Sequence, residues 1–547
     1  MKVLLDLIRS RSKFFYITLV LLSLSQSVTN MGLLMVINMV LGGKHPAWFG
    51  EYTYLMFIAL IVGSFLVSFL FQNLMVDLTN KMTFELEMSF IQKVRASSYE
   101  SFDKLGTEKL YSSIGDIRML SRVPNNIVSL VNSAVTILCS LGYLLWVSPA
   151  SCLTVASMMA GLLVFYLYRN KNIERDMNEL RDLQDTYYGS LRDLFTGFKQ
   201  VKVSHQRNDN LYNNFILFNR SKSKELSIST TKRYIVNEMT GIYSWYVILG
   251  VVIFVLPVFF HIGIAQMTAF ITAVLFMVSP VSQMINLFQF FTGLRIALER
   301  VGKIYSTLAI DSIPVQDRVK SLPPFRSLRF EDIVYRYENE EAPGFELHLK
   351  DFSISREEVV FITGSNGSGK STIVNLLTGL CKPISGKVFI NEREVSWTEY
   401  FEYSNNMAII FTNQHLFREN YDEHDLSEEN APLAYWKKLL NLEGIFKLNK
   451  NNTRIDTNLS KGQQKRLSLL LAMLEEKPIL ILDEWAAEQD PLNRSSFYTQ
   501  WLETIRKKGK AIIAVSHDDD YFHVADRLLK LQAGRVVNDA DLQAVVR

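Results

Sequence analysis

A glycine-rich segment has the residues and the spacing that bind phosphate. It follows an apolar run at 359–363, typical of a buried strand, and precedes an apolar helical stretch. It matches the pattern G-x-x-x-x-G-K-[ST] in that strand-loop-helix context, and its residues are Gly364, Ser365, Asn366, Gly367, Ser368, Gly369, Lys370, Ser371 and Thr372. Its glycines let amide N–H groups approach phosphate oxygens. Lys370 adds charge for the β and γ phosphates, and the Ser371 hydroxyl can ligate Mg²⁺.

Two adjacent carboxylates end a second apolar run, at 479–484. We predict that Asp483 holds Mg²⁺ and that Glu484 polarises the attacking water. Phosphoryl transfer through a loose transition state needs positioning and charge more than covalent chemistry. By itself, a pair of acids at a strand end could equally cap a helix, but the phosphate-binding segment favours the catalytic interpretation.

Two further segments could contact the same nucleotide. Ser460 has the character of a helix N-cap ahead of the helical run 464–473. This would be a second helix N-terminus able to bind phosphate in the domain, and it suggests that a nucleotide is held from both sides. A strand-like run at 511–516 leads to His517, which could contact a γ-phosphate or be an ordinary turn residue.

The whole chain has a composition that excludes several classes of protein. Of its 547 residues, 48% are hydrophobic and 21% are charged, which excludes disorder. The net charge is 58 − 55 = +3, so we expect no nucleic-acid partner. The three cysteines have neither the number nor the spacing for a disulfide framework or a zinc site.

Nearly all long charge-free runs fall before residue 300 and predict an all-α membrane domain over residues 1–322. A bilayer core needs about 20 helical residues. Six segments are predicted to span it, of which the fourth is marginal in length: 14–41, 54–76, 127–147, 152–168, 242–261 and 264–294. Pro280 is expected to kink the last one. The first is too long for a signal-peptide core and is predicted to be retained.

The distribution of Lys and Arg predicts the orientation of these spans. Four precede the first span, seven lie in 77–126 and thirteen lie in 169–233, whereas the opposite side has only Lys44. Both termini are therefore predicted to be cytoplasmic. The long inner connections keep helical periodicity, so the spans are expected to continue as helices into the cytoplasm.

Polar side chains recur at helical spacing in two of the predicted spans. They are Ser23, Gln26 and Asn30 in the first span, and Ser279, Gln283, Asn286 and Gln289 in the last. They could form interhelical hydrogen bonds, or they could line a cavity filled with water or substrate. No charged residue lies deep in a span, so nothing indicates a proton relay.

The second part of the chain, residues 323–547, is predicted to be an α/β P-loop domain. Pro323 and Pro324 mark the linker, and short β-rich runs then alternate with helical stretches. The fold class is thus a multidomain membrane protein, with a six-helix transmembrane domain followed by an α/β nucleotide-binding domain.

The motifs, in this order, resemble those of the ATP-binding cassette (ABC) exporters over essentially the whole chain. They are the P-loop at 364–372, the signature Leu-Ser-Lys-Gly-Gln at 459–463, the acidic strand end at 479–484 and the switch histidine at 517. Two inner-loop stretches, 107–118 and 197–202, look like the family loops that contact the cassettes. The stretches 483–491, 516–522 and 525–527 look most like those of bacterial exporters of cyclic peptides, microcins and siderophore-peptide precursors.

This resemblance implies a type I exporter fold and a homodimer of half-transporters in a bacterial inner membrane. Each ATP would lie between the P-loop of one chain and the signature of the other, with Ser460, Gly462 and Gln463 as signature contacts. Tyr337 matches the aromatic residue that stacks on adenine. Asp490 matches the loop that crosses the dimer interface.

The chain departs from the family pattern at several places. Where the family usually has Gln after a strand, this sequence has Thr412, and Gln414 follows two residues later. Either could complete the Mg²⁺ and water shell. The acidic stretch usual before the signature is replaced by 454–458. No peptidase domain precedes the first span, so we expect no leader-cleaving exporter.

The function indicated is ATP-driven export of a compact or cyclic peptide from cytoplasm to periplasm by alternating access. The expected ligands are ATP and Mg²⁺, and the expected partners are a second copy, a peptide substrate and the lipid bilayer. One alternative is a lipid or hydrophobic-drug exporter of the same architecture. Another is a membrane ATPase that regulates a partner without transport.

Overall fold

A computed structural model describes residues 13–41, 50–261, 263–308, 324–337, 344–448 and 455–541. The chain divides into two compact units. The helical unit contains residues 1–90 and 110–303, and the sheet unit contains residues 91–109 and 304–547. The predicted boundary between 322 and 323 lies outside the described residues, as do Lys44 and the basic residues before Lys13.

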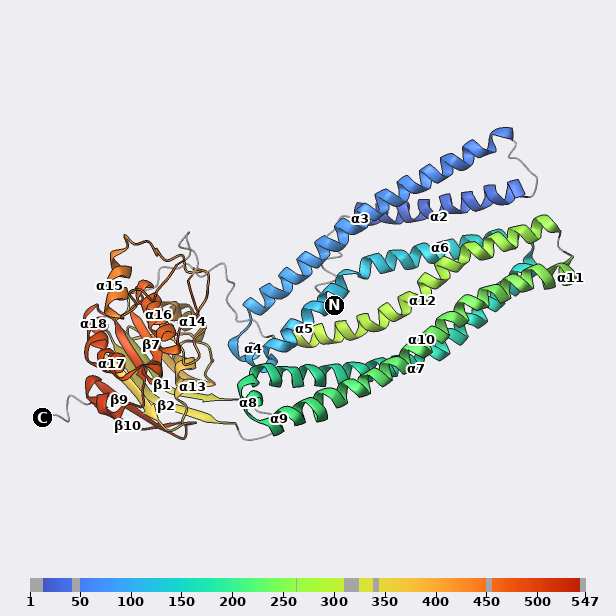
Figure 1. The fold of residues 1–547 in the computed structure, drawn as a ribbon. Coiled ribbons are helices and arrows are strands. Elements are labelled where there is room, and N and C mark those ends of the chain that lie inside the picture. Colours follow the sequence, from blue (N-terminus) through green and yellow to red (C-terminus); the bar gives the residue numbers. More distant parts are fainter. Residues whose placement is uncertain are drawn as a thin grey trace. The chain divides into compact units, whose positions relative to one another are not determined.

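Long helices make up the helical unit (Figure 1). They are α2 (Lys13–Leu41), α3 (Thr53–Arg95), α5 (Thr107–Ser121), α6 (Val123–Val147), α7 (Pro149–Thr196), α10 (Phe218–Gly250) and α12 (Ile264–Thr307). Shorter helices are α8 (Phe198–Val203), α9 (His205–Asn210) and α11 (Leu256–Phe260). Helices α7 and α10 run side by side for most of their length.

Among the described residues, five helices are long and apolar enough to cross a membrane. They contain Leu21–Leu41, Thr53–Arg95, Lys109–Val147, Met239–Phe260 and Ile264–Ile285. The fourth predicted span, 152–168, lies in α7, where the apolar stretch is the shorter Pro149–Leu162. Six crossings therefore stay a prediction, and the fourth depends on this shorter stretch.

Several helices continue well past the length that a bilayer requires. α3, α7 and α12 have 43, 48 and 44 residues, whereas about 20 suffice for one crossing. α12 is a single helix through Pro280. Helices of this length agree with the prediction that the spans continue as helices, and their extension into the cytoplasm stays a prediction.

The polar residues of the spans form hydrogen bonds between helices. Asn132 Nδ2 in α6 donates to Gln26 Oε1 in α2 at 3.5 Å, and Ser133 Oγ donates to Gln283 Oε1 in α12 at 3.1 Å. Ser64 in α3 likewise donates to Asn30 at 3.1 Å. The interhelical interpretation thus accounts for Gln26, Asn30 and Gln283. The side chains of Asn286 and Gln289 lie outside the described residues.

A ten-stranded sheet forms the centre of the sheet unit, which confirms the predicted α/β class. Its order is β5-β4-β1-β2-β10-β9-β3-β8-β7-β6. The strands are β1 (Ser327–Arg336), β2 (Glu346–Ser355), β3 (Val359–Gly364), β4 (Ser385–Ile390), β5 (Arg393–Val395), β6 (Met407–Ile410), β7 (Ile479–Asp483), β8 (Ala511–Val515), β9 (Arg527–Gln532) and β10 (Arg535–Asp541). β3, β8, β7 and β6 pair in parallel, with buried apolar residues on both faces.

Helices cover this sheet (Figure 1). They are α13 (Lys370–Leu377), α14 (Trp397–Tyr403), α15 (Ala431–Leu439), α16 (Lys461–Leu474), α17 (Pro491–Ser496) and α18 (Leu502–Lys507). One hydrophobic cluster contains α13 residues and β1, and a second contains α16 residues with Trp485, Phe497 and Trp501. The two clusters hold the parallel strands between them.

Helix α4 (Tyr99–Leu105) also belongs to the sheet unit, although it precedes the sheet by more than two hundred residues in sequence. Ser98 caps it by accepting a hydrogen bond from the Ser101 N–H. The hydroxyl of Tyr335, in β1, donates to Glu100 Oε1 at 2.7 Å. Sequence reasoning singled out 107–118 as the contacting loop and missed Glu100, which lies just before it.

Candidate active site

The predicted catalytic segments meet at one edge of the sheet. The P-loop follows β3, Asp483 ends β7 and His517 lies two residues beyond β8. These strands are adjacent and parallel, so their carboxyl ends lie at the same edge. Ligands of open α/β sheets bind at that edge. The fold therefore brings together the residues that the sequence predicted separately.

The backbone of the P-loop has conformations that favour glycine. Gly364, Gly367 and Gly369 have φ of 151°, 77° and 108°. A Cβ on Gly364 would lie 2.4 Å from the Leu531 carbonyl oxygen, so no larger residue fits there. Gly369 then opens α13, whose first residue is Lys370.

The side chains of the P-loop are divided between the interior and the surface. Lys370 is buried, and its Nζ donates to the carbonyl oxygens of Gly364 at 2.9 Å and Ser365 at 3.1 Å. Ser368 Oγ is buried without a hydrogen-bond partner. Thr372 is buried, whereas Ser365, Asn366, Gly367 and Ser371 are exposed. The loop thus presents its backbone and the Ser371 hydroxyl to solvent, as a phosphate cradle requires.

Asp483 is contacted by Thr412, the residue that stands where the family usually has Gln. Thr412, just after β6, donates its hydroxyl to Asp483 Oδ2 at 2.7 Å. Gln414 instead accepts the Phe411 N–H at 3.2 Å. Of the two candidates from the sequence, Thr412 is the one that contacts the buried carboxylate.

Glu484 and His517 face each other next to Asp483. His517 Nε2 lies 3.2 Å from Glu484 Oε1, and both side chains are partly exposed. Glu484 has φ 48° and ψ 40°, a left-handed conformation that is unusual for a residue with a side chain. An acid and a histidine in hydrogen-bond reach, open to solvent beside a P-loop, can orient a water molecule for attack on a phosphate.

A buried network supports the backbone at His517. The Tyr498 hydroxyl lies 2.7 Å from Ser516 Oγ and donates to Asp518 Oδ2 at 2.8 Å. Arg494, in α17, pairs with Asp518 at 3.0 Å. Burial raises the pKa of Tyr498 well above its ordinary value, so its hydroxyl remains a donor. Sequence reasoning missed this network, because Tyr498 and Arg494 belong to a helical segment with no motif.

The signature residues begin α16. Ser460 caps this helix in a capping box with Gln463, which confirms the predicted N-cap. A Cβ on Gly462 would lie 2.8 Å from the Glu488 carbonyl oxygen, and Gln489 Nε2 donates to the Gly462 carbonyl oxygen at 3.1 Å. The signature is therefore packed closely against the loop that follows Glu484.

Tyr337 and Asp490, the two residues assigned by resemblance alone, lie far apart in the sequence of the domain. Tyr337, after β1, is 39% exposed, and its ring meets the edge of Tyr335 at 5.0 Å between centroids. Asp490 caps α17 by accepting the Asn493 N–H at 3.0 Å, and this hydrogen bond lowers the pKa of Asp490. Both side chains are accessible to a ligand or a partner.

The oxygen ligands at this edge suit Mg²⁺. Asp483 supplies a carboxylate and Ser371 a hydroxyl, and Mg²⁺ in nucleotide sites commonly takes one or two protein ligands besides phosphate and water. Asp483 and Ser371 thus offer oxygen ligands that fit Mg²⁺ bound together with a nucleotide.

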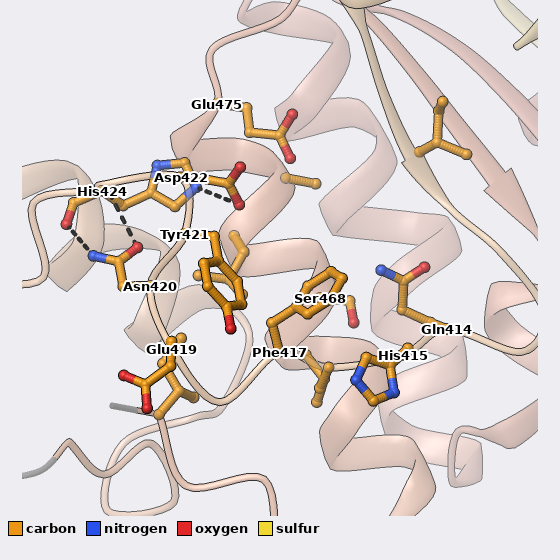
Figure 2. A pocket seen from close by; sticks show the side chains of 15 residues that line it. Gln414, His415, Phe417, Glu419, Asn420, Tyr421, Asp422, His424, Ser468 and Glu475 are labelled. Carbon is orange, nitrogen blue, oxygen red and sulfur yellow. Dashed lines mark hydrogen bonds and ion pairs between the residues drawn. The ribbon is translucent and has the colours of Figure 1, made fainter. Parts of the chain in front are cut away.

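A pocket lies between the segment after Gln414 and α16 (Figure 2). Two exposed aromatic rings, Phe417 and Tyr421, pack edge to face at 5.6 Å between centroids. Three carboxylates line the same pocket, those of Glu419, Asp422 and Glu475.

The chain is similar to known proteins that bind ATP, in agreement with the phosphate-binding geometry of the P-loop. Residues 347–487 match the family model described as ABC transporter. The chain is 28% identical over 532 residues to the ATP-binding protein SyrD of Pseudomonas syringae pv. syringae, with 92% of this chain and 91% of SyrD covered. It is 31% identical over 192 residues to the energy-coupling factor transporter ATP-binding protein EcfA1 of Mycoplasma genitalium, with 34% of this chain and 70% of EcfA1 covered.

The fold as a whole also has a solved counterpart. The structure of a bacterial Atm1-family ABC exporter with ATP bound superposes with a TM-score of 0.73. The match covers 97% of this chain and 95% of that chain, at 15% sequence identity. The predicted order of a helical transmembrane domain and an ABC-type α/β domain is confirmed.

Proposed function

The chain belongs to the ABC transporter family, and we propose that it is a homodimeric, ATP-driven exporter of a compact or cyclic peptide. It is a multi-pass membrane protein whose ATPase is coupled to transport. The observation that carries the catalytic proposal is the 3.2 Å approach of His517 Nε2 to Glu484 Oε1 at the edge that bears the P-loop. Export would run from the cytoplasm to the periplasm of a bacterium across its inner membrane, with both termini cytoplasmic.

Hydrolysis requires the nucleotide and one water molecule to be held in line. The P-loop amides and Lys370 would hold the β and γ phosphates, and Tyr337 would stack on the adenine. Glu484 would accept a hydrogen bond from the attacking water, and His517 would hold the γ-phosphate. Mg²⁺ held by Ser371 and Asp483 would neutralise phosphate charge.

We propose a homodimer because the chain has one P-loop and one signature, which in the resembling family meet across two cassettes. The hydrogen bonds of Ser460, Gly462 and Gln463 run to one another and to the loop after Glu484. In the dimer each signature would meet the ATP on the P-loop of the other chain, and Asp490 would lie near the interface. ATP can close such a dimer only if it binds the closed arrangement more tightly than the open one.

The peptide cargo is supported by the stretches at 483–491, 516–522 and 525–527, which resemble those of bacterial peptide exporters. No charged residue lies deep in a predicted span, and this favours a neutral, compact cargo over an ionic one. The same chemistry suits a lipid. Stimulation of ATPase activity in reconstituted vesicles separates the two: a cyclic lipopeptide should stimulate, whereas stimulation by lipid A or phospholipid alone would favour a lipid exporter.

The catalytic assignment is tested with Glu484→Gln. This variant should bind ATP with unchanged affinity and lose at least about 100-fold in kcat, because the amide cannot accept the proton of water. ATP affinity is measured by equilibrium binding and kcat by phosphate release. Hydrolysis near the wild-type rate would remove Glu484 from the mechanism.

A further inference from the structure

Lys465 makes a contact with the catalytic loop that no motif assigns to it. It lies in α16, five residues after Ser460, and is 4% exposed. Its Nζ donates to the carbonyl oxygen of Glu484 at 3.0 Å. Burying an ammonium group costs free energy unless the group is hydrogen-bonded. We therefore ask what the hydrogen bond from Lys465 to the Glu484 carbonyl contributes.

The conformation of Glu484 indicates what this hydrogen bond contributes. Its φ of 48° and ψ of 40° lie in the left-handed region, which residues with a Cβ occupy only when their surroundings impose it. The turn at Glu484 directs its side chain toward His517. The Lys465 hydrogen bond fixes the carbonyl of the same residue and therefore the same turn.

Trp485, the residue after Glu484, makes a second hydrogen bond with Lys465. Trp485 Nε1 donates to the carbonyl oxygen of Lys465 at 2.9 Å. The Trp485 ring is 1% exposed and stacks on Phe497 at 4.5 Å between centroids. The side chain of Lys465 thus bonds the backbone of Glu484, and the backbone of Lys465 bonds the side chain of Trp485.

Two further contacts join the start of α16 to the residues that follow Glu484. Gln489 Nε2 donates to the Gly462 carbonyl oxygen at 3.1 Å, and Lys461 pairs with Glu488 at 3.2 Å. Every connection joins the first turns of α16 to residues 484–489. A displacement of the signature helix would therefore displace the backbone of Glu484.

We propose that Lys465 is a positioning residue that holds Glu484 in its left-handed turn and makes the aim of the carboxylate depend on the position of α16. The proposal rests on the proposed function, because it presupposes that Glu484 orients the attacking water. In the dimer, the helix whose N-terminus meets one ATP would thereby set the catalytic glutamate for the other ATP. The charge of Lys465 also lies near Asp483 and Glu488.

Lys465→Met tests the proposal, with Lys510→Met as the matched control. Lys510 is a second buried lysine whose Nζ donates to a backbone carbonyl, that of Lys477, away from the catalytic edge. Full-length variants are compared for kcat, for KM of ATP and for ATP affinity. Lys465→Met should lower kcat by about 10- to 100-fold, because a misplaced catalytic group loses rate steeply, while KM and affinity change less than about twofold. Lys510→Met should leave all three within about twofold.

Three results would overturn the proposal: an unchanged kcat in Lys465→Met, a loss of kcat that Lys510→Met reproduces, or a loss that follows weaker ATP binding. If Lys465→Met does not fold, Lys465→Gln removes the charge and shortens the reach, and the same fall in kcat at unchanged KM is expected. Glu484→Gln, assayed in parallel, separates this proposal from the function on which it rests. An active Glu484→Gln refutes the function, whereas an inactive Glu484→Gln beside a fully active Lys465→Met refutes the positioning role alone.

Discussion

At the scale of single residues, the carboxylate of Asp483 is held by a hydroxyl where the family pattern has an amide. Asp483 is 5% exposed, and the Thr412 hydroxyl is 2.7 Å from its Oδ2. Such a hydrogen bond orients a metal-binding carboxylate, and supporting partners of this kind strongly influence metal affinity. We therefore propose that Thr412, rather than Gln414, supports the Mg²⁺ and water shell at Asp483.

Thr412→Val tests this assignment, because valine keeps the shape and removes the hydroxyl. We expect the Mg²⁺ concentration for half-maximal ATPase activity to rise about 10-fold, in the range usual for partners of metal ligands. Gln414→Ala should shift it less than about twofold, since Gln414 bonds the Phe411 N–H instead. Equal shifts in both variants, or a shift in Gln414→Ala alone, would contradict the assignment. Mg²⁺ titrations of ATPase activity provide the comparison.

At the scale of elements, a partly buried hydrogen bond joins helix α4 to strand β1. Tyr335 is 3% exposed, and its hydroxyl donates to Glu100. Burial, together with the Glu100 hydrogen bond, raises the pKa of Tyr335 far above its ordinary value, so the hydroxyl donates at any physiological pH. The Tyr335 ring also contacts the ring of Tyr337, nearly perpendicular to it. A path of two aromatic rings therefore leads from the proposed adenine site to α4.

Tyr335→Phe removes the hydroxyl and keeps the ring contact with Tyr337. Basal ATPase activity should remain within about twofold of wild type, whereas stimulation by a cyclic lipopeptide should fall about fivefold, which corresponds to about 1 kcal/mol for one hydrogen bond. Glu100→Gln is the matched variant, because its amide oxygen can still accept, and its stimulation should be reduced less. Wild-type stimulation in Tyr335→Phe would show that this bond carries no coupling.

Local patterns predicted the elements around the P-loop well, because the strand, the loop and the helix follow one another directly in sequence. The sheet order was not predictable in the same way: β3 lies between β9 and β8, whose residues come more than a hundred positions later. The contacts of Glu100 and Lys465 depend on that tertiary arrangement. For Lys465 the sequence contains no local signal, because it stands among polar residues at the start of α16.

At the scale of the whole molecule, the nearly balanced charge of +3 conceals two units with different surroundings. The helical unit exposes large apolar side chains such as Phe65, Phe69 and Leu138, which are stable against lipid and costly in water. The sheet unit has its own core. The apolar runs predicted the first unit and the nucleotide motifs the second, whereas the cargo leaves no comparable pattern because an uncharged, polar bundle suits several compact molecules.

ATP-dependent movement of a labelled cyclic lipopeptide into inverted membrane vesicles tests the central claim most directly. We expect uptake in wild-type vesicles supplied with ATP and Mg²⁺. We expect no uptake above background in vesicles that contain the Glu484→Gln variant, although this variant binds ATP normally. Vesicles that hydrolyse ATP without moving peptide, lipid or hydrophobic drug would contradict transport and indicate a regulatory membrane ATPase. Uptake that persists in Glu484→Gln would contradict the coupling of transport to hydrolysis at this site.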